Sequence, residues 1–239
     1  PQEIKALYES CENSKFMFDE LTKHTNFIVD CKRIIINKEL KWFELKNIKI
    51  KLLVTYKNQY GNQYWYKNGR IHRDNGPAKI WSNGDQHWYK NGRIHRDNLP
   101  AIILASGEQC WYKDGLQHRD NDLPAIIKAD GSQYWYKNDL LHRDNGPAII
   151  LADGDQYWYQ NGNYHRDNDL PAIIFSNGDQ YWYKNGKRHR DNNLPAVIEL
   201  NGHQLWYKNG ERHRDNGPAI IYSDGTQHWY KNGKCIRVE

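Results

Sequence analysis

The sequence has few of the features that mark secreted proteins, metalloproteins or membrane proteins. Its 239 residues contain only four cysteines and one methionine. The cysteines form no CxxC pair and occupy unrelated places in the chain, so neither a disulfide framework nor a structural zinc site is indicated. No apolar run approaches the length of a membrane span, and no signal peptide is recognisable. We therefore expect a soluble, intracellular protein.

Charge of one sign is not concentrated in any segment. The net charge is +5, with 11 basic and 8 acidic residues in residues 1–61 and 23 basic and 21 acidic residues in the rest. A nucleic-acid-binding protein usually gathers its basic residues on one face. Acidic and basic residues alternate along this chain instead, so we expect no nucleic-acid partner.

Aliphatic residues are also too scarce for one large spherical core. The hydrophobic fraction is 38% and the mean hydropathy is −1.00. Much of the apolar surface belongs to rings with a polar tip, since the chain has ten Trp and seventeen Tyr but five Phe. This composition is typical of half-buried β structure.

The Trp residues mark an internal repeat of 23 or 24 residues. The same sequence motif recurs around each of them, as in GDQHWYKNGRIHRDNLPAIILASG at 84–107. Trp42 lies one further step upstream and marks a degenerate copy. We predict a divergent N-terminal cap at 1–60 that includes this copy, followed by tandem repeats at 61–239. The clean copies are centred on Trp65, Trp88, Trp111, Trp135, Trp158, Trp182, Trp206 and Trp229.

Two turn signals divide each repeat. Asn-Gly follows Trp-Tyr-Lys, and a second Asn-Gly or Asp-Gly precedes the next Trp; such pairs supply the two positive φ angles of a type I′ turn. One strand is predicted at Asp85–Lys90 and its equivalents, so each repeat is one hairpin. A hairpin alone is marginal in water. We therefore predict an all-β fold of tandem β-hairpins stacked into an elongated, solenoid-like rod.

Alternation along the strands predicts which side chains face the core. In the strand after Pro-Ala, the Ala and the second Ile point inward, as in Ala148 and Ile150, and they share their side with Trp. The next position varies and points outward, so it is our candidate binding surface. These residues are Trp81, Leu104, Lys128, Leu151, Phe175, Glu199 and Tyr222. A second variable set is at residues 70-71, 93-94, 116-117, 140-141, 163-164, 187-188 and 211-212.

His-Arg-Asp occurs seven times and matches the start of a protein-kinase catalytic loop. That loop also needs an Asn five residues after the Asp to bind metal, and no copy has one, so we expect no catalytic residue. Instead, the Asp is predicted to accept local backbone N–H groups and the Arg to pair with an Asp of its own or the adjacent repeat. Equivalent His residues start about 10 Å apart, too far apart to share a zinc ion easily. We expect no metal and no cofactor.

The pattern D-G-x-x-Y/W-x-x-N-G-K-x-H at a 23-residue period over residues 61–239 resembles the MORN repeat family. H-R-D-N-G-P-A stands where MORN units usually carry H-G-x-G, and arrays with this wording resemble repeat proteins of Mimivirus-like giant DNA viruses. The resemblance implies stacked hairpins, protein–protein interaction and, in some members, binding to phospholipid surfaces. A viral origin would place the protein in the host cytoplasm.

We expect a non-enzymatic interaction scaffold with an unidentified protein partner. The alternative is a phospholipid-surface or glycan-binding module, because Tyr beside Trp can stack on sugars. After Trp229 no Pro-Ala-Ile strand follows and Ile236 takes the place of His, which predicts an incomplete last hairpin. We expect either a homodimer through this C-terminal edge or protection of the edge by Lys234, Arg237 and Glu239.

Overall fold

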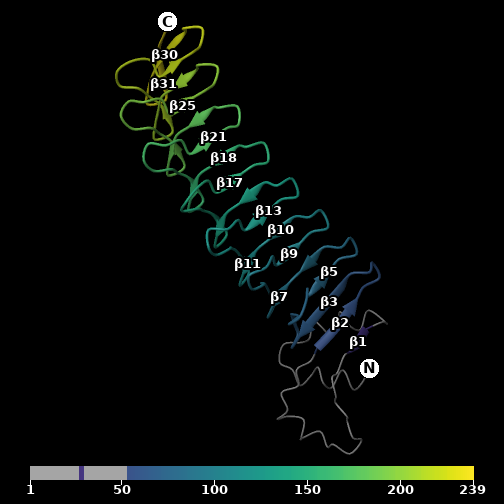
Figure 1. Cartoon of the computed structure of the whole chain (residues 1–239). Helices are drawn as coiled ribbons and strands as arrows, with labels where there is room; N and C mark the ends of the chain where they lie inside the picture. The colour runs from purple at the N-terminus through teal and green to yellow at the C-terminus, as the bar shows by residue number, and fades with distance from the viewer. Residues whose placement is uncertain (1–26, 30–52) are drawn as a thin grey trace, which may run out of the picture. The chain divides into compact units, whose positions relative to one another are not determined.

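The computed structural model describes residues 27–29 and 53–239 (Figure 1). These residues form strands and turns, and none of them is helical. The degenerate repeat predicted around Trp42 and most of the predicted cap at 1–60 lie outside the described residues. The chain divides into two compact units, Pro1–Gly115 and Leu116–Glu239.

In the first unit, each repeat contributes two strands to an antiparallel ladder. β1 (Phe27–Val29) pairs with β2 (Leu53–Lys57), and β2 pairs along its whole length with β3 (Gln63–Lys67). The predicted boundary between residues 60 and 61 falls in the turn of this β2–β3 hairpin. The ladder continues from β3 through β5 (Lys79–Ile80), β6 (Gln86–His87) and β9 (Ile102–Ile103) to β10 (Gln109–Cys110).

The second unit contains a longer ladder of the same kind (Figure 1). Each repeat supplies one Ile-Ile or Val-Ile strand and one strand that begins with Gln, all antiparallel. The prediction of an all-β fold built from tandem hairpins is therefore confirmed. The order is β13 (Ile126–Ile127), β14 (Gln133–Tyr134), β17 (Ile149–Ile150), β18 (Gln156–Tyr157), β21 (Ile173–Ile174), β22 (Gln180–Tyr181), β25 (Val197–Ile198), β26 (Gln204–Leu205), β29 (Ile220–Ile221), β30 (Gln227–Lys231) and β31 (Lys234–Val238).

A second series of short hairpins follows the Trp residues. In the first unit these are β3 with β4 (Arg70–Ile71), and β7 (Tyr89–Lys90) with β8 (Arg93–Ile94). In the second unit they are β15 (Tyr136–Lys137) with β16 (Leu140–Leu141), β19 (Tyr159–Gln160) with β20 (Asn163–Tyr164), β23 (Tyr183–Lys184) with β24 (Lys187–Arg188), and β27 (Tyr207–Lys208) with β28 (Glu211–Arg212). The remaining described strands are β11 (Tyr112–Lys113) and β12 (Leu116–Gln117).

Trp interrupts the strand predicted at Asp85–Lys90 because its backbone groups bind two different partners. The N–H of Trp88 donates to the carbonyl oxygen of Ala101 at 2.7 Å, whereas the carbonyl oxygen of Trp88 accepts from the N–H of His95 at 3.1 Å. β6 before this residue joins the ladder, and β7 after it joins a short hairpin. The prediction of one hairpin per repeat is therefore wrong, since these repeats have two.

The two kinds of hairpin use different turns. Asn91 and Gly92, at the tip of the β7–β8 hairpin, have φ angles of 53° and 85°, which confirms the type I′ prediction. In the β5–β6 turn only Gly84 has a positive φ, of 98°. The side chain of Asn83 instead accepts a hydrogen bond from the N–H of Asp85 at 3.1 Å. The type I′ prediction fails here because Asn is used as a side-chain acceptor within a longer turn.

Ala and Trp form the buried core, as predicted. The Ala after each Pro has no exposed surface, and several indoles are only 4–6% exposed. Trp65, Trp88, Trp158 and Trp229 are half-buried. The fully buried Ala residues are Ala78, Ala101, Ala125, Ala148, Ala172, Ala196 and Ala219, and the buried Trp residues are Trp111, Trp135, Trp182 and Trp206.

The second Ile of each ladder strand, which was predicted to face the core, is half-buried, and in three strands of the second unit the residue before it is more buried. Ile198 is half-buried, whereas Val197 beside it is 1% exposed. Val197 lies in one hydrophobic cluster with Trp182 and Tyr207, and Tyr207 belongs to the short hairpin series. The prediction did not include the short hairpins, one of which supplies Tyr207 to this cluster.

The difference between 23- and 24-residue repeats lies in the loop between His-Arg-Asp and Pro-Ala. The longer loops run over residues 120–124, 167–171 and 191–195. In each of them an additional residue offers its carbonyl oxygen to the indole of the next Trp. The hydrogen bonds join Trp135 to Asp122, Trp182 to Asp169 and Trp206 to Asn193, all at 2.9 Å. These three Trp side chains are among the most buried, so the longer loop helps to close the core.

The last described hairpin is complete, contrary to the prediction. β31 pairs along β30, and Glu239 and Gln227 exchange both backbone hydrogen bonds. The guanidinium carbon of Arg237 lies 4.7 Å from the centre of the Trp229 ring. The residues after Trp229 therefore cover it in place of a Pro-Ala-Ile strand. A homodimer through this edge stays a prediction, which light scattering tests.

Candidate functional site

The His of each His-Arg-Asp segment links one repeat to the next. His189 Nε2 lies 2.9 Å from Asp191 Oδ1, and His189 Nδ1 accepts a hydrogen bond of 3.1 Å from the N–H of Asn209 in the next short hairpin. The imidazole therefore joins a carboxylate to a turn of the neighbouring repeat. The same pair of contacts is made by His72 with Asp74 and Asn91, His95 with Asp97 and Asp114, His118 with Asp120 and Asn138, His142 with Asp144 and Asn161, His165 with Asp167 and Asn185, and His213 with Asp215 and Asn232.

The Asp of the segment binds side chains and not the local backbone that the sequence suggested. Asp74 accepts a hydrogen bond from His72 and pairs with Lys67 Nζ at 2.7 Å. These two contacts lower the pKa of Asp74 from 3.8 to about 2. The pKa values of the equivalent Asp97, Asp144, Asp191 and Asp215 are also lowered, in each case first by the His of the same segment.

These lowered pKa values predict acid sensitivity. A carboxyl whose folded-state pKa is depressed stabilises the fold above its unfolded pKa, and this stabilisation is lost as the pH falls through the folded value. For Asp74 the window lies between about pH 4 and pH 2. We expect the thermal midpoint to fall across this window, and to fall less in Asp74→Asn. Equal pH profiles for the two proteins would show that this carboxylate does not contribute.

The Arg of the segment stacks on Trp, which the sequence did not predict. The guanidinium carbon of Arg190 lies 3.9 Å from the centre of the Trp182 ring, and Nη1 donates to the carbonyl oxygen of Pro195 at 3.3 Å. One face of the indole is thus covered by a cation. The same stacking, at 3.7–3.9 Å, joins Arg73 to Trp65, Arg96 to Trp88, Arg143 to Trp135, Arg166 to Trp158 and Arg214 to Trp206.

The predicted pairing of this Arg with an Asp of the adjacent repeat is made by Arg143 and Arg190. Arg143 Nε lies 3.2 Å from Asp122 Oδ2, and Arg190 Nη2 lies 3.0 Å from Asp169 Oδ2. In both cases the partner is the additional Asp of a longer loop and not the Asp of a His-Arg-Asp segment. One face of each of these indoles is covered by an Arg. The rings are therefore less suited to stacking on sugars, which the glycan-binding alternative requires.

The seven variable residues predicted to form a binding surface occupy one structural position. The N–H of Phe175 donates to the carbonyl oxygen of Asp179 at 3.0 Å, and its own carbonyl oxygen accepts from Gly178 at 2.9 Å. The same bonds recur at every other member of the set. All seven side chains are half-buried and not fully outward. Phe175, for example, has edge-to-face contacts with Tyr157 and Tyr181, at centroid distances of 5.9 and 5.3 Å.

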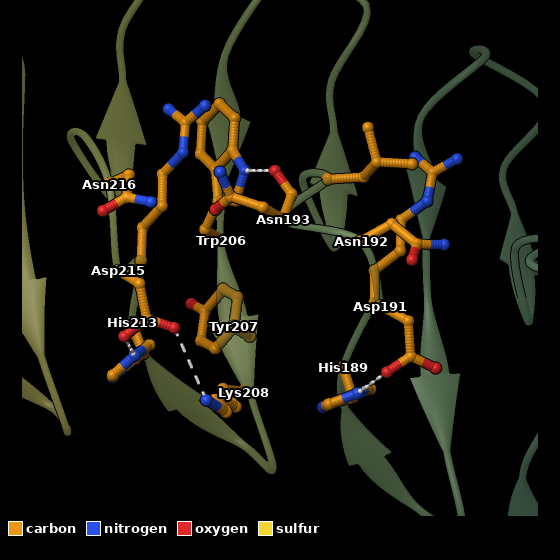
Figure 2. Close-up of a pocket in the computed structure, with 13 residues that line it drawn as sticks. His189, Asp191, Asn192, Asn193, Trp206, Tyr207, Lys208, His213, Asp215 and Asn216 are labelled. Atoms are coloured by element: carbon orange, nitrogen blue, oxygen red, sulfur yellow. Dashed lines mark hydrogen bonds and ion pairs between the residues drawn. The ribbon is translucent and has the colours of Figure 1, made fainter.

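A hollow between two successive His-Arg-Asp segments was not predicted. It lies in the second unit between residues 189–194 and residues 206–216 and has a volume of about 330 Å³. Figure 2 shows Asn193 beside Trp206, and Lys208 pointing toward Asp215, with 3.5 Å between Lys208 Nζ and Asp215 Oδ2. Its lining combines guanidinium, amide and carboxylate groups with the exposed side chain of Leu194, so it is suited to a polar ligand.

No protein-family model matches the sequence, and no curated protein matches it. Among the residues that the structure describes, no cluster of His, Cys, Asp or Glu is arranged to hold a metal ion. The same residues include no helix long and apolar enough to cross a membrane.

Proposed function

We propose that the protein is a repeat scaffold that binds another protein through the row formed by its variable positions. The observation that supports this best is a constant backbone with changing side chains. In the second unit, successive row positions carry Lys128, Leu151, Phe175, Glu199 and Tyr222, although each makes the same backbone hydrogen bonds. A framework that fixes the backbone while the residue type varies suits recognition of a partner surface.

Bonds between neighbouring turns keep the row in register. The N–H of Ser176, next to Phe175, donates to the carboxylate of Asp155 in the preceding turn at 2.8 Å. The N–H of Leu200, next to Glu199, donates to Asp179 at 2.7 Å. Because these turns are fastened to the turns before them, Phe175 and Glu199 are held in register with the preceding row positions. Preorganised side chains lose less conformational entropy on binding.

A matched pair of double variants tests the row. Phe175→Ser with Glu199→Lys changes the row, whereas Lys187→Glu with Glu211→Lys changes the exposed tips of two short hairpins, which carry the second variable set. Proteins captured by the wild type are purified and their affinities for all three forms are measured directly. We expect the row variant to weaken binding by at least about tenfold, equivalent to 1.4 kcal/mol, and the tip variant to leave it unchanged.

Two other outcomes would contradict the proposal. Loss of binding only in the tip variant would move the recognition surface to the short hairpins and contradict the row. If the wild type binds phospholipid vesicles or immobilised glycans and no protein, the scaffold proposal is wrong and the alternative class holds. Circular dichroism and thermal melting confirm that each variant is folded before binding is compared.

A further inference from the structure

Three repeats of the second unit carry the longer loop and place its additional residue alike. Asp122, Asp169 and Asn193 have left-handed φ angles of 54°, 54° and 56°. In each, the carbonyl oxygen accepts a hydrogen bond of 2.9 Å from an indole. The three backbones are therefore equivalent, and the side chain differs only in being a carboxylate or a carboxamide.

Where this residue is Asp, its carboxylate binds the Arg of the next repeat. Arg190 Nε lies 3.1 and 3.2 Å from the two carboxylate oxygens of Asp169, and Nη2 lies 3.0 Å from one of them. Arg143 Nε lies 3.3 and 3.2 Å from the oxygens of Asp122. The Nε edge of the guanidinium is thus a carboxylate-binding edge in two repeats, as expected from its planar array of donors.

Where the residue is Asn193, the same edge lacks a carboxylate. Arg214 is otherwise held like Arg190, with its guanidinium carbon 3.8 Å from the centre of the Trp206 ring and Nη1 donating to Pro218 at 3.1 Å. Its Nε is buried and has no hydrogen-bond partner. A buried donor of a charged group without a partner is unfavourable, and a carboxylate at this edge would remove the penalty.

The loop after Arg214 packs closely against the guanidinium. It is the shorter Asp-Asn-Gly-Pro form, and a Cβ at Gly217 would lie 3.2 Å from Arg214 Nη1 and 3.5 Å from Nε. Only glycine fits without strain this close to the guanidinium. Arg214, Asn193 and Asn216 line the hollow of Figure 2, and Leu194 adds an exposed apolar group.

The neighbouring acidic residue does not occupy Arg214. Asp215 Oδ1 lies 2.9 Å from His213 Nε2, and Asp215 Oδ2 lies 3.5 Å from Lys208 Nζ. Both of its carboxylate oxygens are therefore already engaged. A carboxylate that completes the Arg214 edge without breaking these contacts has to come from outside the repeat.

We infer that the hollow at Arg214 is a carboxylate-binding site, in which an Asp or Glu side chain of an acidic peptide takes the place that Asp169 holds against Arg190. The two oxygens of a carboxylate match the Nε and Nη2 donors. Leu194 and Asn216 offer apolar and amide contacts to the rest of the peptide. The ligand of this site is defined by its carboxylate, and the inference does not depend on the variable row.

The test is a titration of the full chain, labelled with ¹⁵N, with N-acetyl-aspartate amide while the Nε–Hε signals of the arginines are followed by NMR. We expect a saturable shift of the Arg214 signal and little change at Arg143 and Arg190, whose edges are already filled. N-acetyl-asparagine amide, which is neutral and nearly isosteric, is the control and should cause no saturable shift.

Two variants at Asn193 test whether the unpaired Nε edge of Arg214 is what binds the carboxylate. Asn193→Asp supplies the carboxylate within the chain, so we expect it to abolish the titration and to move the Arg214 signal toward those of Arg143 and Arg190. Asn193→Ala should keep the titration. A wild type that does not titrate, an equal response to the neutral analogue, or a response seen only in Asn193→Ala would overturn the inference. The last result would mean that the Asn193 amide itself fills the edge.

Discussion

Replacement of Trp182 by alanine is expected to lower the free energy of unfolding by about 3–5 kcal/mol, the usual cost of truncating a buried aromatic side chain. The ring is 5% exposed, and its indole N–H donates to the carbonyl oxygen of Asp169 at 2.9 Å. Truncation therefore removes the ring contacts, leaves that carbonyl without its donor and removes the ring on which Arg190 stacks. Urea denaturation followed by circular dichroism measures the loss.

Trp158→Ala is the matched control, because Trp158 occupies the same place in a shorter repeat. This ring is half-buried, and the loop before it, at residues 144–147, lacks the additional residue. We expect a loss about 1–2 kcal/mol smaller than for Trp182, since truncation costs follow burial. Equal losses in the two variants would show that the longer loop does not contribute to closing the core.

The repeat and the strands were predictable because both are properties of local sequence. The Trp spacing located every repeat in the described tandem array, and Ile-Ile beside turn residues indicated the ladder strands. The position of Trp88 between two hairpins was not predictable by the same reasoning. Alternation shows that a residue lies in an extended segment, but it does not show that its N–H and carbonyl groups bind different partners.

The contacts between repeats could not be predicted from local sequence either. Asn91 was correctly placed at the tip of a hairpin, but the acceptor of its N–H is His72 in the preceding repeat. Such contacts depend on how repeats stack and not on any one strand. The stacking of Arg on Trp was missed because an Arg followed by Asp suggested an ion pair, although Trp is also a partner for Arg.

The candidate sites were also predictable only in part, because some of their features depend on packing and not on local sequence. Alternation identified the variable row, but it did not predict the contacts of Phe175 with Tyr157 and Tyr181 on the neighbouring strands. The carboxylate site at Arg214 was inferred from an Arg–Asp hydrogen bond that is present in two repeats and missing in a third. Its sequence signal was available, since Asn193 stands where Asp122 and Asp169 stand in the other long loops. This difference could be interpreted only after the structure showed the carboxylates of Asp122 and Asp169 bound to Arg143 and Arg190.

Arg190→Ala is expected to lower the free energy of unfolding by about 2–4 kcal/mol. An exposed Arg–Asp pair, as the sequence suggested, would contribute at most about 1 kcal/mol. The side chain of Arg190 is only 14% exposed and binds Asp169 of the preceding repeat. It also stacks on Trp182 and donates to Pro195, so one guanidinium joins two loops and an indole. Hydrogen bonds of a charged group contribute about 1.5–3 kcal/mol and cation–π stacking about 0.5–2 kcal/mol, without being strictly additive.

Two further variants identify which of these contacts matters. Arg190→Lys keeps the charge but loses the planar fork that binds the carboxylate from the side, so we expect it to recover less than half of the lost stability. Asp169→Asn removes the ion pair but keeps the carbonyl oxygen that binds Trp182, and it recreates the arrangement found at Asn193. We expect a smaller loss for Asp169→Asn than for Arg190→Ala, because the stacking and the bond to Pro195 remain. If Arg190→Ala and Asp169→Asn cost the same, the ion pair alone stabilises this contact and the stacking on Trp182 contributes nothing measurable.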